Sequence, residues 1–143
     1  MTELSLGQRA EITRKFGEQD IVEYIALTGD SNPIYYDQDE ARKVGYSGLA
    51  VPGALIGGMF STLLGTKLPG GGTNYLKQSL RFLHLASAND EFTAAVEIVR
   101  LRPEKELVNL RTVCINQAGE TVCEGEALVL VRDIQTGPSV IKG

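Results

Sequence analysis

A short polar segment between two apolar stretches holds the side chains best suited to chemistry. Residues 28–37 read Thr-Gly-Asp-Ser-Asn-Pro-Ile-Tyr-Tyr-Asp, which places the carboxyl of Asp30, the amide of Asn32 and the phenol of Tyr35 close together. A carboxylate can act as a general acid or base, whereas a phenol with an ordinary pKa of about 10 donates hydrogen bonds and is a poor base at neutral pH. Pro33 keeps Asn32 out of helical angles, so we predict a turn that carries these groups.

Histidine and cysteine, which often carry out catalysis or bind metals, are rare in this chain. The chain has one His and two Cys among 143 residues. One His excludes a metal site with two His ligands, and a Ser-His or Cys-His mechanism would have to use His84. We predict that His84 ends a strand at the rim of a sheet. If a hairpin turns at Ala118-Gly119, Cys114 faces Cys123, and we expect two small buried thiols. No metal or redox cofactor is implied.

The elements that position these residues divide the chain into a helical first half and a strand-rich second half. Apolar residues at helical spacing predict a helix over 18–28 that stops at Gly29, and short helices are expected over 37–43 and 52–64. The period then changes to two. A leading strand and four long strands are predicted over 8–16, 76–82, 92–99, 107–116 and 121–131.

The helix over 52–64 fixes the fold class. Its sequence, PGALIGGMFSTLL, has no charged face, which predicts a helix that is buried all round. Gly57 and Gly58 suggest that another backbone packs close to it. The turns between the four long strands are short, so we expect consecutive strands to be antiparallel neighbours. The sequence therefore predicts an α+β protein whose antiparallel sheet wraps around a central apolar helix.

The composition of the chain limits the classes of partner that it could bind. The chain carries 14 Lys and Arg against 18 Asp and Glu, a net charge of −4, which argues against nucleic acid and anionic membranes as partners. The longest apolar stretch, 49–64, is shorter than the roughly 20 residues that span a membrane. The N-terminus lacks the features of a signal peptide. We expect a single cytoplasmic domain over 1–143, with a loose tail at 136–143.

The chemical segment resembles the signature of the MaoC-like hydratases, the (R)-specific enoyl-CoA hydratases of the hot-dog fold. That signature reads approximately S/T-G-D-x-N-P-I-H-x-D and matches residues 28–37. The segments 51–53, 68–75 and 79–82 are similar to the same family in the same order. The resemblance covers about 16–131 and implies the hot-dog fold, with an antiparallel sheet around a central helix.

The resemblance also implies a role for each matching position. Asp30 matches the acidic member of a catalytic Asp-His dyad, and Asn32 matches an Asn that orders the loop near the reacting centre. Gly53 matches a Gly whose N–H, aided by the helix dipole, holds the thioester oxygen. Ser61 lies where the family has a polar residue that supports the dyad. The family's His position is occupied by Tyr35, and many members have another His where this chain has Pro52.

The resemblance implies a hydratase or dehydratase that acts on enoyl-CoA and 3-hydroxyacyl-CoA thioesters, or on acyl-carrier thioesters, and that forms a homodimer or higher homo-oligomer. Because Tyr35 replaces His, three outcomes are open. Asp30 acts alone as the base while Tyr35 orients water, or the pocket catalyses another acyl-thioester reaction such as thioester hydrolysis. In the third, the protein is a non-catalytic acyl-CoA binding module.

Structural interpretations of the same residues stay open beside these. Asp30 is also a common turn-stabilising residue, and Tyr35 could simply pack. Ser61 could bond to a carbonyl one turn back. The Gly70-Gly71-Gly72 run lacks the residues of a phosphate loop and is read as a flexible connection. Candidates for binding CoA phosphates, or else plain solvated charges, are Arg42, Lys43, Lys67 and Lys77.

Overall fold

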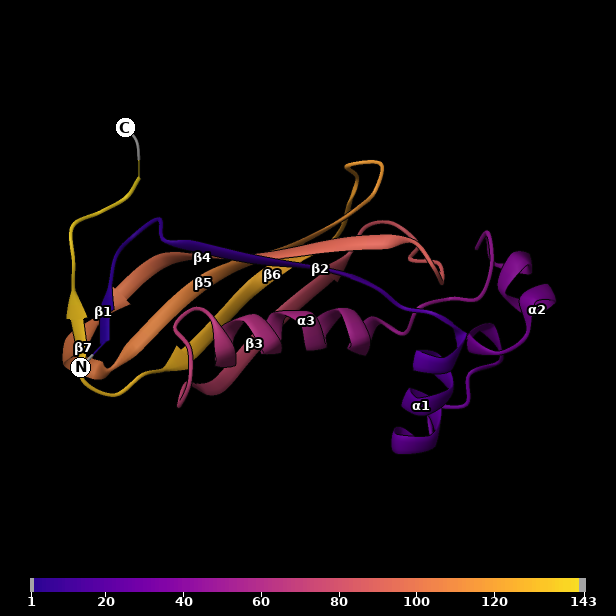
Figure 1. Cartoon of the computed structure of the whole chain (residues 1–143), viewed down its shortest axis with the longest axis horizontal. Coiled ribbons are helices and arrows are strands. Elements are labelled where there is room, and N and C mark those ends of the chain that lie inside the picture. The colour runs from indigo at the N-terminus through magenta and orange to yellow at the C-terminus, as the bar shows by residue number, and fades with distance from the viewer. Residues whose placement is uncertain (1, 142–143) are drawn as a thin grey trace.

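The computed structural model describes residues 2–141, and its centre is a five-stranded antiparallel sheet with a long helix across one face (Figure 1). The strands lie in the order β2 (Arg9–Lys15), β4 (Glu91–Arg102), β5 (Leu107–Asn116), β6 (Thr121–Leu130) and β3 (Asn74–Phe82). A single turn of 3₁₀ helix, η2 (Pro103–Lys105), joins β4 to β5. The α+β class and the antiparallel sheet are confirmed.

Helix α3 (Gly53–Thr66) packs one face against the concave side of the sheet. That face is fully buried and consists of Ile56, Met59, Phe60, Leu63 and Leu64. The expectation that this helix is buried all round is wrong, because the single sheet covers one side and leaves Ala54, Gly58, Ser61, Thr62 and Thr66 exposed. No backbone packs against the internal glycines either: the nearest atom to a Cβ built on Gly57 belongs to the Leu80 side chain, at 3.5 Å.

The position of β3 differs from the predicted order. β3 and β4 are not neighbours, because β3 lies at the far edge of the sheet and pairs with β6. Residues 83–90 pass across the end of the sheet, where Ser87 forms an isolated bridge with Ala50. β3 can approach β6 closely because Gly125 has no side chain: a Cβ there would overlap the carbonyl oxygen of Ser79. The short-turn prediction is therefore wrong for this strand, because β3 pairs with β6 and not with β4.

Two short strands join the ends of the described chain. β1 (Thr2–Leu4) pairs in parallel with β7 (Ile134–Thr136), a pairing that the sequence pattern does not predict. Beyond β7, Gly137 and Val140 donate backbone hydrogen bonds to the carbonyls of Leu4 and Leu6, each at 2.8 Å. The tail that we expected to be loose is thus bound to the N-terminal segment as far as 141, and 142–143 lie outside the described residues.

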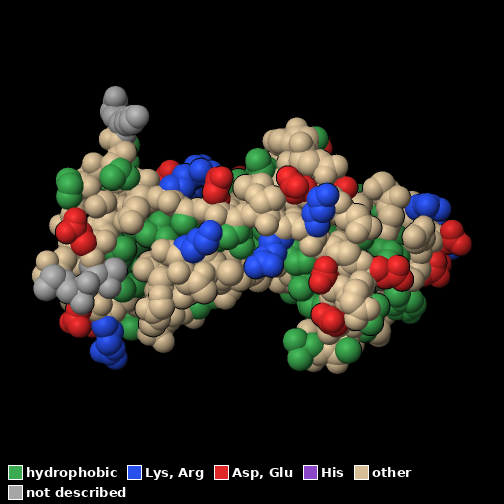
Figure 2. Space-filling model, in the orientation of Figure 1, with side chains coloured by type: hydrophobic (Ala, Val, Ile, Leu, Met, Phe, Trp, Pro, Cys, Tyr) green, Lys and Arg blue, Asp and Glu red, His purple; other side chains and the backbone are tan. Residues whose placement is uncertain are grey.

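The segment with the chemical residues forms a lobe beyond the end of the sheet (Figure 1). It contains α1 (Glu18–Thr28), the 3₁₀ turn η1 (Pro33–Tyr35) and α2 (Gln38–Lys43). The N–H of Ala50 donates to the carbonyl of Ile34 at 2.9 Å, which fastens η1 to the segment that leads into α3. In Figure 2 the lobe stands apart from the sheet, with a hollow between the two on the lower side.

The two cysteines face each other, as predicted from a hairpin that turns at Ala118-Gly119. Cys114 on β5 and Cys123 on β6 are directly paired, are fully buried and are free thiols. Within the described residues, no helix is long and apolar enough to cross a membrane.

Candidate active site

The carboxylate of Asp30 is held by the end of α1. Gly29 adopts a left-handed φ of 76°, and its N–H caps the helix on the carbonyl of Ile25 at 2.8 Å. This conformation favours glycine, and it turns the chain back toward the helix. The Tyr24 hydroxyl, six residues earlier, donates to Asp30 Oδ2 at 2.9 Å. Thr28 Oγ1 accepts from the Asp30 N–H at 3.1 Å, so both ends of Asp30 are fixed.

Tyr35 lies close to Asp30 within η1. Asn32 begins this turn, and its Oδ1 accepts from the N–H of Ile34 at 3.2 Å. The rings of Tyr35 and Tyr24 meet edge to face, with centroids 6.2 Å apart and planes at 86°. The charge of Asp30 acts on the Tyr35 phenol, yet the hydrogen bonds among residues 2–141 do not join the two side chains. Tyr24, not Tyr35, is the phenol that contacts the carboxylate.

Three tyrosines around this point stay protonated at neutral pH. Burial, followed by the hydrogen bond to Asp30, raises the pKa of Tyr24. Burial and then the charge of Asp30 raise the pKa of Tyr35, and burial alone raises that of Tyr46. A buried phenol next to a negative charge keeps its proton because ionisation would cost both desolvation and repulsion. The three hydroxyls are therefore hydrogen-bond donors and not bases.

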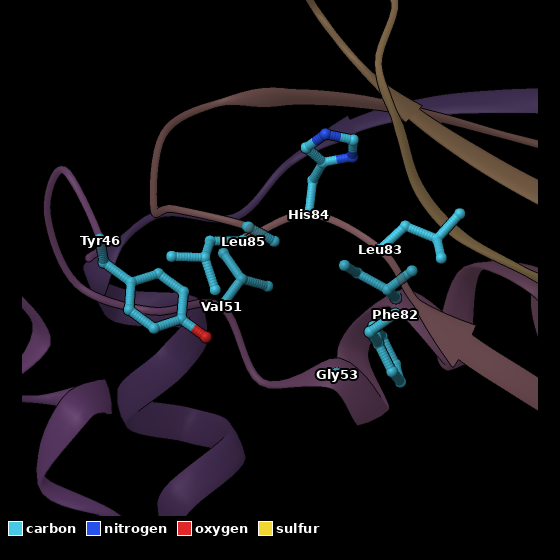
Figure 3. Close-up of a pocket in the computed structure, with 9 residues that line it drawn as sticks. Tyr46, Val51, Gly53, Phe82, Leu83, His84 and Leu85 are labelled. Carbon is cyan, nitrogen blue, oxygen red and sulfur yellow. The ribbon is translucent and has the colours of Figure 1, made fainter. Parts of the chain in front are cut away.

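A pocket of about 350 Å³ opens beside this cluster (Figure 3). Tyr46 extends its ring and hydroxyl into the pocket from one side, and Gly53 and Phe82 form the opposite side. Its lining is mainly apolar and consists of Tyr46, Val51, Gly53, Ile56, Phe82, Leu83, His84, Leu85 and Ala86. Such a pocket suits an apolar chain whose polar end faces the α3 N-terminus.

Gly53 is the first residue of α3, after the N-cap residue Pro52. The first N–H groups of a helix lack partners within the helix and carry its positive dipole end, so they can bind a carbonyl oxygen that gains negative charge. A Cβ on Gly53 would lie 2.7 Å from Phe82 Cζ, so glycine also lets the Phe82 ring lie over the start of the helix. The glycine at this position is therefore required for the packing of Phe82 against the start of α3.

The other candidate residues lie outside the cluster. Ser61 is on the exposed face of α3, about 12 Å along the helix axis from Gly53, and the hydrogen bonds of the described chain do not include its hydroxyl. The bonds to a carbonyl one turn back are made instead by Thr62 and Thr66.

His84 follows β3 and turns its ring away from Tyr46 and Gly53 (Figure 3). Its Nδ1 lies 2.8 Å from the carbonyl of Thr121, and its Nε2 lies 3.4 Å from Glu120 Oε2. The predicted strand-end position is confirmed. Burial raises the pKa of the Cys114 thiol to about 12 and that of Cys123 to about 11, so neither is an activated nucleophile.

The chain is similar in sequence to a known protein family. The model of the FAS1-like, dehydratase domain region matches residues 6–125, which is most of the chain. The chain belongs to this dehydratase family. An (R)-specific enoyl-CoA hydratase of Aeromonas caviae is 38% identical to it over 126 residues, which cover 88% of this chain and 94% of the relative. An (R)-specific enoyl-CoA hydratase of Rhodospirillum rubrum is 39% identical over 125 residues, covering 87% and 86%.

A solved structure places this family member in the hot-dog fold. The (R)-hydratase from A. caviae involved in PHA biosynthesis superposes with a TM-score of 0.85 at 38% identity, and the match covers 90% of this chain and 97% of that one. The resemblance to MaoC-like, (R)-specific enoyl-CoA hydratases is confirmed at the level of family and fold.

Two residues of this dehydratase-family site are missing from the sequence-based set, namely Tyr24 and Tyr46. A signal for Tyr24 exists, since a helix that stops at a left-handed glycine folds the following Asp back onto its last turns. Tyr46 gives no such signal, because it lies in an irregular loop.

The basic candidates are exposed in this dehydratase-family chain. Lys43 pairs with Glu40 at 2.9 Å, and Lys67 Nζ lies 3.3 Å from the carbonyl of Glu11. Within residues 2–141, no group of three or more His, Cys, Asp or Glu side chains is placed to hold a metal ion.

Proposed function

We propose that the protein is a hydro-lyase of the (R)-specific enoyl-CoA hydratase type, which interconverts enoyl-CoA and 3-hydroxyacyl-CoA thioesters. The observation that carries this proposal is the Asp30 carboxylate, held by Tyr24 on a loop that is fastened to the entry of α3. An apolar pocket and a helix N-terminus accompany it, as an acyl chain and a thioester carbonyl require. Family membership supplies the reaction class.

In this mechanism Asp30 is the single base. It takes a proton from water as the water oxygen bonds to the β-carbon, and the π electrons move onto the thioester as an enolate. The N–H of Gly53 stabilises the enolate oxygen at the positive end of α3. The carboxyl of Asp30 then returns its proton to the α-carbon, so the net change is the addition of one water. Dehydration runs the same steps backward.

Tyr35 orients the attacking water in this proposal. Its raised pKa keeps the hydroxyl protonated, so it donates to the water oxygen and leaves the proton on the other side for Asp30. Asn32 holds the turn that carries Tyr35. Ser61 remains a proposed supporting residue, and it is exposed in the single chain.

The test is turnover of a short trans-2-enoyl-CoA, followed by loss of the enone thioester absorbance. We expect measurable hydration by the wild type and a fall in kcat of about 10²- to 10⁴-fold in Asp30→Asn, the usual contribution of a general base. Tyr36→Phe, which alters an exposed tyrosine, is the matched control and should keep the wild-type rate. An inactive wild type that becomes active as Tyr35→His would contradict the proposal.

A second candidate function is acyl-CoA binding without turnover. The absence of an imidazole at Asp30 favours it, since the His84 ring faces Thr121 and Glu120. It predicts calorimetric binding of acyl-CoA with unchanged affinity in Asp30→Asn and with no product. Release of free CoA from a saturated acyl-CoA would point instead to a thioesterase.

A homodimer and a cytoplasmic location complete the proposal. The edge strand β3 has an unpaired backbone edge and exposes Tyr75, Leu76, Leu80 and Phe82 at 37–53% of their surface. An apolar edge strand of this kind normally pairs or is covered. The uncharged, exposed face of α3 adjoins it. The two free thiols, Cys114 and Cys123, suit a reducing compartment.

A further inference from the structure

The mechanism above uses the hydrogen bond from Tyr24 to Asp30 only as the contact that holds the carboxylate. The Tyr24 hydroxyl donates to Asp30 Oδ2 at 2.9 Å, and both side chains are half-buried. A carboxylate that accepts a hydrogen bond on one oxygen cannot rotate freely about its last torsion. The other oxygen, Oδ1, is thereby fixed in direction, and it remains to accept a proton from water.

Two further contacts hold Tyr24 in place. Its carbonyl accepts from Thr28 Oγ1 at 2.8 Å, and the same Oγ1 accepts from the N–H of Asp30 at 3.1 Å. The Tyr24 ring meets the Tyr35 ring edge to face at 6.2 Å. One hydroxyl-bearing ring on α1 therefore contacts both side chains to which the mechanism assigns proton transfer and water orientation.

The state of the phenol supports this role. The pKa of Tyr24 is raised by burial and by its hydrogen bond to Asp30, so the proton stays on the tyrosine oxygen and the carboxylate stays the acceptor. Tyr24 is therefore a donor that orients the base and does not compete with it for the proton of water.

We propose that Tyr24 is a positioning residue, which fixes Asp30 Oδ2 so that Oδ1 is the atom that takes the proton of water. This inference rests on the proposed hydratase function. Proton transfer depends steeply on geometry, and a displacement of about 1 Å can cost on the order of 10²-fold in rate. Tyr24, like Asp30 and Tyr35, is not among the residues that line the pocket, so we expect its loss to affect the chemical step more than substrate binding.

The test compares Tyr24→Phe with Tyr36→Phe in hydration of trans-2-enoyl-CoA, at a temperature where melting curves show both variants folded. Phe keeps the ring against Tyr35 and removes the donor alone. We expect kcat of Tyr24→Phe to fall about 10- to 100-fold while KM changes less than about twofold. Tyr36→Phe, with the same loss of a hydroxyl at an exposed site, should keep both constants.

The outcomes separate this inference from the proposed function. A wild type without turnover overturns the hydratase proposal and the role of Tyr24 together. An active wild type with an unchanged kcat in Tyr24→Phe overturns the role of Tyr24 alone. A rise in KM that matches the loss in kcat/KM would also overturn it, because Tyr24 would then contribute to binding and not to the chemical step.

Discussion

At the scale of single residues, the candidate site has one carboxylate and several phenols where the family signature has an Asp-His pair. Asp30 is the acidic group, Tyr24 and Tyr35 lie close to it, and Tyr46 lies beyond Tyr35; burial raises the pKa of all three phenols. In the family pattern an imidazole with an ordinary pKa of about 6.5 could share proton transfer. Here the phenols can only donate, so in the proposed mechanism one carboxylate both takes and returns the proton.

The pH dependence of kcat follows from Tyr35. The phenol donates to water only while protonated, and its raised pKa extends the protonated form above the ordinary value of about 10. We therefore expect kcat to hold its plateau up to about pH 10 and to fall only above it. A pH profile with enzyme-free blanks measures this, and Tyr36→Phe should follow the wild type. A basic limb near neutral pH would contradict a phenol donor.

Gly53 offers a second prediction at this scale. A Cβ at this position would lie 2.7 Å from Phe82 Cζ, so Gly53→Ala must push the Phe82 ring from the start of α3. We expect kcat/KM to fall about 10- to 100-fold, since one oxyanion donor and its wall are displaced together. Gly71→Ala, in the exposed loop between α3 and β3, is the matched control, because Gly71 does not have a left-handed φ and nothing lies within 4 Å of the added Cβ. Equal activity in the two variants would remove Gly53 from the site.

At the scale of elements, the sequence predicts local structure better than it predicts neighbours. Helix α1 and strand β5 begin and end at the residues expected from periodicity and stop signals, and the Cys114–Cys123 pairing follows from one hairpin turn. These features depend on nearby residues only. The edge position of β3 depends on a crossing segment, 83–90, whose path is set by contacts with Ala50 and the rest of the fold. Turn length alone therefore predicts the wrong neighbour for β3.

The residues of the candidate site divide in the same way, into those that the sequence predicts and those that depend on tertiary contacts. The sequence, read through the family signature, selects Asp30, Tyr35 and Gly53; Asp30 and Tyr35 lie together beside Tyr24, and Gly53 lines the pocket at the start of α3. It does not select Tyr24 or Tyr46. Tyr24 contacts Asp30 because the chain reverses direction after α1, and Tyr46 lies in an irregular loop. Ser61 was selected by its position in the pattern, but in the single chain it faces outward. Hydrogen-bond partners across a turn are a tertiary property, and no periodicity encodes them.

The cap of α1 is the element on which the Asp30 geometry depends. Gly29 has a φ of 76° and no neighbour within 4 Å of an added Cβ, so Gly29→Ala meets backbone strain without a clash. We expect a loss of about 1–2 kcal/mol in the free energy of unfolding, measured with urea, and a lower kcat as Asp30 shifts. Gly29→Asn is the control, because Asn tolerates this conformation and should retain more of both. The opposite ranking of Ala and Asn would show that the left-handed cap is not what positions Asp30.

At the scale of the whole molecule, one chain has the features of half an assembly. The sheet buries one face of α3 and leaves the other uncharged and exposed, with Gly57 of that helix packed against Leu80 of β3. β3 forms the open edge of the sheet and is exposed along almost its whole length. These two surfaces belong to neighbouring elements, so one partner could cover both. The apolar sequence of α3 predicts a helix that is buried all round. That prediction can hold only in an assembly in which a partner also covers the exposed face of α3.

The oligomeric state can therefore be tested on β3 itself. Leu76 is 53% exposed and lies at the irregular point of the β3–β6 pairing, so Leu76→Asp adds a charge to the open edge with little effect on the fold. We expect light scattering after size-exclusion chromatography to give twice the chain mass for the wild type and the mass of one chain for Leu76→Asp. Leu27→Asp is the matched control, because Leu27 is 87% exposed on α1 and should leave the dimer intact. A wild-type monomer, or a dimer that survives Leu76→Asp while Leu27→Asp dissociates it, would move the interface away from β3. Since the pocket includes Phe82 at the end of β3, dissociation should also lower hydration activity at protein concentrations where the wild type remains paired.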